Sequence, residues 1–327
     1  MNQSKARITA LGSYVPEKVL TNDDLEKMVD TSDEWIVQRT GIKERRISRE
    51  DEYTSDLSYQ AVQDLVSRSQ KQIDDVDMII VCTLTPDFKT PSVASLLQAK
   101  LGIQQAGALD LNAACAGFTY GLHMANGLIT AGLHKKILVV GAETLSKITD
   151  YEDRTTCILF GDGAGVALVE YDEKHPSFLA AHVGSEGEKG KHLYSSNLSN
   201  QLFGEEIQAT SRIVQNGREV YKWAVTSVPK GLNSLLDKAS MSLKEVNWFV
   251  PHSANLRMIE SICERAGFPL EQTLYRLVNY GNTSSATIPL ALNKAHVEGK
   301  LKAGDTIILY GFGGGLSFAG LVIEWGI

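Results

Sequence analysis

Cys115 is the residue of this chain best placed to act as a nucleophile. It lies in the stretch from Gly107 to Gly132, GALDLNAACAGFTYGLHMANGLITAG, which begins as a short apolar strand and continues as a helix. We expect Cys115 in the first turn of that helix, where free backbone N–H groups and the positive end of the helix dipole favour the thiolate. Small neighbours leave room for a substrate carbonyl. The stretch predicts an exposed, activated thiol, although cysteine is also a common small hydrophobe of protein cores.

Two polar residues in later turns could act together with a nucleophilic thiol. His252, in FVPHSANLRM, follows a buried strand, and open α/β sheets bind ligands beyond the carboxyl ends of their strands. The alternative for His252 is a buried histidine with satisfied hydrogen bonds. Asn282, in NYGNTSSATIPLAL, lies in another polar turn that leads into a helix. It could bind substrate or simply cap the helix.

Three consecutive glycines, Gly313 to Gly315, follow another buried strand in YGFGGGLSFAG. A loop of this kind can direct backbone N–H groups at a developing oxyanion. It can also be a tight connection between two paired strands.

The elements around these residues alternate buried strands with amphipathic helices, which predicts an α/β fold with a parallel sheet covered on both sides. VNWFVPHSANLRMIESICERAG resembles VDMIIVCTLTPD and its helix, and DTIILYGFGGGLSFAGLVIEW resembles KKILVVGAETLS followed by GDGAGVALVEY. Both pairs are about 170 residues apart, which indicates an internal duplication. We therefore expect two similar halves, 1–172 with the cysteine and 173–327 with the histidine and asparagine. Between them, TTCILFGDGAGVALVEY is expected to form a pair of strands with glycines at the bend.

Composition excludes several classes of function. A net charge of -7 argues against nucleic-acid binding, which usually needs a basic surface. No apolar run is long enough for a membrane span and the N-terminus lacks the apolar core of a signal peptide, so we expect a cytoplasmic protein. The four cysteines, Cys82, Cys115, Cys157 and Cys263, are widely spaced, which favours reduced thiols and no metal site.

Four motifs taken together, LNAACAG, VPHSAN, NYGNTS and GFGGG, resemble β-ketoacyl-acyl-carrier-protein synthase III, which initiates type II fatty-acid synthesis. The similarity extends through TSDEWIVQRTGIKERR and DRTTCILFGDGAG and covers essentially the whole chain. It implies an α/β, thiolase-like, internally duplicated fold with five layers, αβαβα, usually in a homodimer. It also implies an acyltransferase that condenses a short or branched acyl-CoA primer with malonyl-acyl-carrier protein, losing carbon dioxide, without a metal or redox cofactor.

Carried onto this sequence, the resemblance makes Cys115 the acyl-accepting nucleophile. His252 and Asn282 would donate hydrogen bonds to the thioester carbonyl of the malonyl group and stabilise the enolate that forms. The backbone N–H groups of Cys115 and Gly314 would hold the oxyanion of the acylation step.

The resemblance also implies where the two substrates bind. Thr31, Trp35 and Arg154 match residues that bind the CoA of the primer, with Trp35 stacking on adenine; from the residues alone, Trp35 would be a half-buried packing residue. An acidic carrier protein needs a local basic patch on this acidic chain. The residues that match the carrier-protein docking region are Lys222, Ser253, Ala254, Asn255, Leu256 and Arg257.

Thr90 departs from the family pattern. Many members carry a phenylalanine there that reaches across the dimer and floors the acyl pocket of the partner. A small polar residue should deepen that pocket, so we expect tolerance of branched or longer acyl primers.

Two alternatives accompany this interpretation. The first is a related acyl-condensing synthase of a secondary-metabolite pathway. The second is a binding or structural protein that kept the fold without catalysis, which is disfavoured because all three catalytic positions hold the expected residues.

Overall fold

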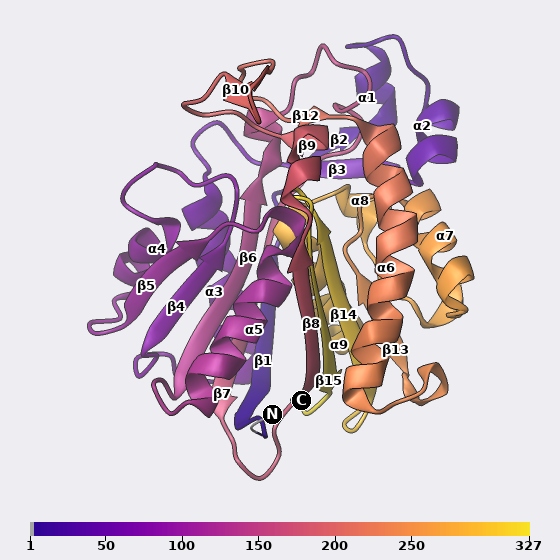
Figure 1. The fold of residues 1–327 in the computed structure, drawn as a ribbon. Coiled ribbons are helices and arrows are strands. Elements are labelled where there is room, and N and C mark those ends of the chain that lie inside the picture. Colours follow the sequence, from indigo (N-terminus) through magenta and orange to yellow (C-terminus); the bar gives the residue numbers. More distant parts are fainter. Residues whose placement is uncertain (1–2) are drawn as a thin grey trace.

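Two β-sheets face each other with helices between them and outside them in the computed structural model, which describes residues 3–327 (Figure 1). Of the described strands, five form the first sheet in the order β1 (Ala6–Tyr14), β7 (Asp162–Tyr171), β6 (Lys136–Thr144), β4 (Met78–Cys82) and β5 (Gly107–Leu111). Four more form the second sheet in the order β13 (Trp248–Pro251), β14 (Thr306–Gly313), β15 (Ser317–Glu324) and β8 (Phe178–Ser185).

Both sheets are mixed, so the prediction of a parallel sheet is only partly right. β4 is parallel to β5 and β6, but β7 is antiparallel to both of its neighbours. In the second sheet, β13 is parallel to β14, whereas β15 is antiparallel to β14 and β8. The predicted strand pair in TTCILFGDGAGVALVEY is wrong, because residues 155–159 form turns and only β7 is a strand. Local sequence does not indicate whether neighbouring strands run parallel or antiparallel, because that depends on how the connection between them crosses the sheet.

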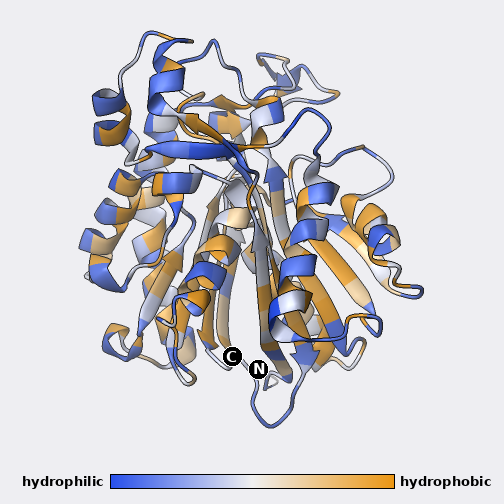
Figure 2. Cartoon of the chain, turned by 180° about the vertical axis from the view of Figure 1, so that it is seen from behind, coloured by the Kyte–Doolittle hydropathy of each residue, from blue (hydrophilic) through white to orange (hydrophobic). Residues whose placement is uncertain are grey.

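The helices complete five layers and confirm the predicted αβαβα architecture. They are α3 (Thr54–Ser69) and α4 (Val93–Leu101) outside the first sheet, α5 (Gly117–Thr130) and α9 (Thr287–Val297) between the sheets, and α6 (Gly217–Ala239) and α7 (Leu256–Ala266) outside the second. The central core joins apolar side chains of α5 and α9 to strands of both sheets. Figure 2 shows the strands as largely hydrophobic, while the helices alternate hydrophobic and hydrophilic segments, as expected where one helix face is buried.

The strand orders reveal the duplication directly. Reading β1-β7-β6-β4 against β8-β15-β14-β13 gives the same sequence of antiparallel and parallel pairs. The predicted boundary at residue 172 falls in the segment between β7 and β8, and it stays a prediction.

Smaller elements cover one end of the two sheets (Figure 1). They are α1 (Asn22–Glu26), α2 (Asp33–Thr40), α8 (Leu277–Tyr280), and the strand pairs β2 (Lys18–Thr21) with β3 (Glu44–Ile47), β9 (Leu193–Tyr194) with β12 (Val214–Gln215), and β10 (Gln201–Leu202) with β11 (Glu205–Glu206). Val214 and Gln215 belong to β12, so α6 begins only at Gly217.

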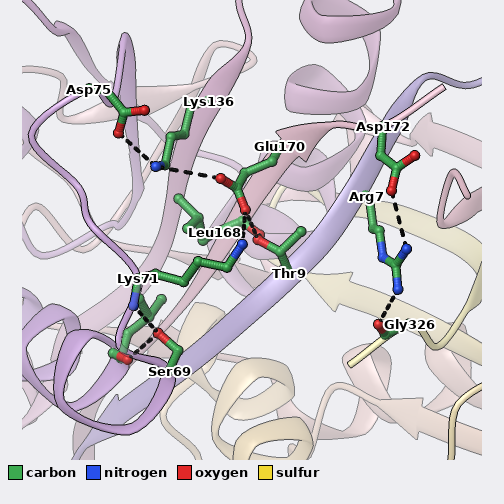
Figure 3. A network of polar contacts seen from close by, with 11 residues as sticks. Arg7, Thr9, Ser69, Lys71, Asp75, Lys136, Leu168, Glu170, Asp172 and Gly326 are labelled. Carbon is green, nitrogen blue, oxygen red and sulfur yellow. Dashed lines mark hydrogen bonds and ion pairs between the residues drawn. The ribbon is translucent and has the colours of Figure 1, made fainter. Parts of the chain in front are cut away.

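Ionic contacts tie strand ends together on the first sheet (Figure 3). Lys136 lies between Asp75, at 2.6 Å, and Glu170, at 3.4 Å. Arg7 pairs with Asp172 and donates to the backbone carbonyl of Gly326, so it joins β1 to the last residues of the chain. Partly exposed pairs of this kind contribute about 0–1 kcal/mol each. None of the helices described, from residue 3 onward, combines the length and hydrophobicity needed to cross a lipid bilayer.

Candidate active site

Cys115 lies in a tight 3₁₀ turn, Ala114–Ala116, between β5 and α5. The prediction that the first turn of the helix carries Cys115 is therefore wrong, since Cys115 lies in the turn just before α5, which begins at Gly117. Ala114, just before the cysteine, has a φ of 45°, in the left-handed region that non-glycine residues seldom adopt. Such strain costs of order 1–3 kcal/mol and is common at active sites, where it fixes the direction of a side chain.

The Cys115 thiol is buried, which corrects the expectation of an exposed, activated thiol. Only 8% of the residue is exposed, and burial raises the pKa of the thiol to about 11. The hydroxyl of Ser284 and the backbone N–H groups of Gly314 and Cys115 itself lower this pKa in part. Their effect is smaller than the cost of removing a charged sulfur from water, so the resting group is a thiol. The contact with Ser284 does not meet the geometry of an ordinary hydrogen bond.

His252 follows β13 at the carboxyl end of the strand, as predicted, and is almost fully buried. Its backbone N–H donates to the carbonyl of Tyr310 at 2.8 Å, and Nδ1 lies 2.9 Å from Oγ1 of Thr287. Burial lowers the pKa of His252 to about 3, and a contact with the backbone of Ser284 opposes this shift only in part. The imidazole is therefore neutral at physiological pH.

Thr287 allows either neutral tautomer of His252. Its hydroxyl lies 2.9 Å from Nδ1 of the imidazole and 2.9 Å from the carbonyl oxygen of Ser284. When the hydroxyl donates to Ser284, its oxygen accepts Nδ1–H and Nε2 is an acceptor. When it donates to Nδ1, Nε2 carries the proton and is a donor.

Asn282 is held through both its backbone and its side chain. The backbone N–H donates to Leu159 O at 2.8 Å, and the carbonyl accepts from Gly161 N at 3.0 Å. Oδ1 accepts the backbone N–H of Ser284 at 2.9 Å. Because a backbone N–H can only donate, this contact identifies the side-chain oxygen and leaves the amide NH₂ available as a donor.

One pocket of about 860 Å³ brings these groups together. Cys115, His252, Asn282 and Gly314 all line this space, which we call the central pocket. Gly313 lies beside the cysteine, and a Cβ there would be 2.8 Å from the sulfur, so only glycine fits. A nucleophile, a neutral base or donor, an amide donor and backbone N–H groups thus share one cavity, as acyl transfer requires.

The three residues expected to bind CoA lie close together but do not line the central pocket. Trp35 is in α2, and the guanidinium of Arg154 lies 4.9 Å from the centre of its ring. Thr31 lies just before Ser32, whose side chain caps α2. Sequence reasoning missed Arg39, whose guanidinium is 5.6 Å from the same ring, one helical turn after Trp35.

The residues expected to contact a carrier protein lie in different environments. Arg257 and Lys222 are exposed, although Lys222 is paired with Glu219 at 2.7 Å. Ala254 and Asn255 line the central pocket, and Asn255 also caps α7 through Met258 N at 2.9 Å. Leu256 packs against Gly41.

Ser253 corrects that expectation. It is buried, and its hydroxyl donates to the carbonyl of Pro251 at 3.4 Å. The side chain therefore cannot reach the surface as the site stands, because the turn after β13 points it inward. Thr90, by contrast, is exposed in the loop after β4 and does not line the central pocket, whereas its neighbour Lys89 does.

Comparison with known proteins places the chain in a family. The family model for 3-oxoacyl-[acyl-carrier-protein] synthase III matches residues 109–187, and the model for its C-terminal part matches residues 236–325. A β-ketoacyl-[acyl-carrier-protein] synthase III 2 of Halalkalibacterium halodurans is 71% identical over 99% of this chain and 98% of its own. The chain belongs to the 3-oxoacyl-[acyl-carrier-protein] synthase III family.

Other members of the 3-oxoacyl-[acyl-carrier-protein] synthase III family agree in sequence and in shape. A β-ketoacyl-[acyl-carrier-protein] synthase III 2 of Staphylococcus epidermidis is 62% identical over 99% of this chain and the whole of its own. A crystal structure of the Thermus thermophilus synthase III has a TM-score of 0.94 at 46% identity and covers 98% of this chain and 99% of that one.

Family membership confirms three predictions: the thiolase-like fold, an acyltransferase, and a condensation that initiates fatty-acid synthesis. It favours this role over the secondary-metabolite alternative.

Proposed function

We propose that the central pocket condenses an acyl-CoA primer with malonyl-acyl-carrier protein, with Cys115, His252 and Asn282 as the catalytic residues. The observation that supports this proposal is that residues from three distant segments meet in one cavity. The assembled groups supply every function that the reaction needs, and we expect no metal or redox cofactor to take part.

In the acylation step, the sulfur of Cys115 attacks the thioester carbonyl of the primer. Among the described residues that line the pocket, His252 is the one imidazole, and it is neutral, so its Nε2 accepts the thiol proton in the first tautomer. The N–H groups of Cys115 and Gly314 hold the oxyanion. The bond between the carbonyl carbon and the CoA sulfur then breaks, and CoA leaves with the proton that His252 returns.

In the condensation step, the second tautomer of His252 and the amide of Asn282 donate hydrogen bonds to the thioester carbonyl of the malonyl group. Carbon dioxide leaves, and its bonding electron pair forms an enolate that these two donors stabilise. The enolate carbon attacks the acyl group on Cys115. The sulfur departs, takes up a proton, and returns to the resting thiol.

Replacement of Asn282 tests the division of labour between the two steps. Asn282→Ala should release carbon dioxide from malonyl-carrier protein at least 100-fold more slowly, while acylation of Cys115 stays within threefold of wild type. Asn126→Ala is the matched control, because Asn126 lies on α5 outside the pocket and its amide oxygen accepts the hydroxyl of Ser4. Retained decarboxylation in Asn282→Ala would refute its assigned role.

The primer range depends on Thr90 in this proposal. In a dimer, the exposed loop that carries Thr90 would meet the pocket of the other copy, and a small residue leaves more space than phenylalanine. A panel of acyl-CoAs should show activity with branched and longer primers, and Thr90→Phe should shift activity toward acetyl-CoA. Activity with acetyl-CoA alone, unchanged in Thr90→Phe, would contradict the idea.

We also propose that CoA binds at Trp35, Arg154 and Thr31, and that the carrier protein docks beside Arg257 and Lys222. Trp35 offers an aromatic surface, and the exposed cations suit an acidic partner. Arg257→Glu should raise the KM for malonyl-carrier protein and leave the KM for acyl-CoA unchanged. Equal changes in both constants would refute a docking role.

We propose that the protein forms a homodimer, and the observation that supports this is the unpaired edge of strand β5. β5 pairs with β4 on one side, and within residues 3–327 no strand pairs with its other side. Four of its five residues are half-buried and apolar or acidic, GALDL, and a second copy could extend the sheet across a two-fold axis. Light scattering should give twice the monomer mass of 35.7 kDa.

We propose the cytoplasm as the location of the protein, because catalysis needs a free thiol and the cytoplasm is reducing.

A further inference from the structure

The duplicated halves place Cys115 and Ser285 in equivalent positions. Each follows a residue in the left-handed region, Ala114 with a φ of 45° and Ser284 with a φ of 48°. Each lies in a 3₁₀ turn, and each turn leads directly into a helix of the central layer. The second half therefore keeps the geometry of the nucleophile turn but carries a serine where the first half carries the cysteine.

The hydroxyl of Ser285 does not face the central pocket. It lies 2.7 Å from the carbonyl of Cys82 and 3.1 Å from Oε1 of Glu143, and the residue is 1% exposed. Ser284 lines the pocket but Ser285 does not. The serine thus links the second half to two strands of the first half, β4 and β6.

Glu143 is a buried carboxyl group, and no cation among residues 3–327 forms an ion pair with it. It is 0% exposed and accepts the backbone N–H of Leu84 at 3.1 Å and the hydroxyls of Thr83 and Thr85 at 3.1 and 2.6 Å. Burial raises the pKa of Glu143 to about 7, against the effect of these hydrogen bonds. A carboxyl group surrounded by donors in a dry site holds them in fixed directions.

The side chain of Asn282 depends on the turn that Ser285 anchors. Its backbone is held by Leu159 and Gly161, but the orientation of its amide rests on the N–H of Ser284. His252 also contacts the backbone of Ser284, but its own backbone N–H is held separately by the carbonyl of Tyr310 on β14. A shift of the turn would therefore turn the amide of Asn282 first.

We propose that Ser285 and Glu143 are a positioning pair that holds the Ser284 turn and directs the Asn282 amide at the malonyl thioester. The inference rests on the role proposed for Asn282. Neither residue lines the central pocket, so the pair acts through the Ser284 turn, whose backbone N–H holds the amide of Asn282. A misplacement of about 1 Å in such a donor can cost about 100-fold in rate.

Ser285→Ala and Glu143→Gln test the pair in the full-length protein. Two rates are measured for each variant: carbon dioxide release from malonyl-carrier protein, and the mass increase on Cys115 with acyl-CoA. We expect carbon dioxide release to fall about 10- to 100-fold, with acylation within threefold of wild type. Ser285→Ala is the milder change and keeps the test valid if Glu143→Gln does not fold.

Ser177→Ala is the matched control. Ser177 is equally buried, and its hydroxyl oxygen accepts the backbone N–H of Ile8 at 3.2 Å. It lies just before β8, whose other end, at Ser185, lines the central pocket. It should lower thermal stability as Ser285→Ala does without changing either rate. Equal losses in both rates, or unchanged carbon dioxide release in Ser285→Ala, would overturn the inference.

Asn282→Ala separates this inference from the proposed function. If Asn282→Ala keeps decarboxylation, the proposed function of Asn282 fails and the positioning pair fails with it. If Asn282→Ala loses decarboxylation while Ser285→Ala and Glu143→Gln keep it, only the positioning pair is refuted.

Discussion

The resting state of Cys115 should appear in the pH dependence of its alkylation. Burial raises the pKa of the thiol from 9.0 to about 11, a difference of about 2.7 kcal/mol against the thiolate. At pH 8 about one molecule in a thousand would carry the thiolate, compared with about one in ten at a pKa of 9.0. The rate with iodoacetamide should therefore be about 100-fold lower than that of an unburied thiol.

The assay is iodoacetamide labelling in buffers from pH 6 to 10, with the label on the Cys115 peptide counted by mass spectrometry. Because the thiolate is the reactive form, the rate should rise about tenfold with each pH unit and show no plateau below about pH 10. Cys115→Ala checks that the label is assigned correctly, since the other three cysteines are also free and buried. Protein stability is followed at each pH so that unfolding is not counted as reactivity.

A plateau below pH 8 would refute the reasoning. It would mean that the turn and the backbone N–H groups of Cys115 and Gly314 stabilise the thiolate more than burial disfavours it. The sequence expectation of an activated thiol would then be right, and His252 would not be needed as the proton acceptor in acylation.

Three further substitutions test separate parts of the site. Gly313→Ala should abolish acylation of Cys115 while the protein stays folded, because the added Cβ would lie 2.8 Å from the sulfur; normal acyl-enzyme by mass would contradict this. Trp35→Ala should raise the KM for acyl-CoA about tenfold and leave kcat unchanged, since it removes only CoA binding, and an unchanged KM would refute the stacking role. Thr287→Val removes the hydroxyl that contacts Nδ1 of His252, so both half-reactions should slow about tenfold; a change in only one would show that a single tautomer serves the enzyme.

The sequence predicted where the catalytic residues lie in the fold better than it predicted how buried they are. Cys115, His252 and Asn282 each follow a recognisable strand or turn, so periodicity and turn residues indicated where they would lie. The duplication was visible because two strand and helix patterns recur at one spacing. The grouping of Trp35 with Arg154 came from family resemblance alone, since no local pattern links residues so far apart.

Burial was the property that local sequence could not predict. Cys115 and Ser253 both lie in turns with small or polar neighbours, which suggested exposure, but segments distant in the chain cover them. No local pattern indicated a role for Ser285, because its partners Cys82 and Glu143 belong to the other half. In a fold built from two stacked halves, contacts of this kind join residues far apart in the chain, and local sequence patterns do not show them.

The central claim is that one buried sulfur carries the acyl group from CoA to the enolate. Intact-mass measurement tests it in two stages: acyl-CoA is added first and malonyl-acyl-carrier protein second. The account predicts a mass increase equal to one acyl group on Cys115, followed by its loss as β-ketoacyl-carrier protein appears, with neither change in Cys115→Ala. Product formation by Cys115→Ala, or an adduct that stays on the wild-type protein after the second addition, would contradict it.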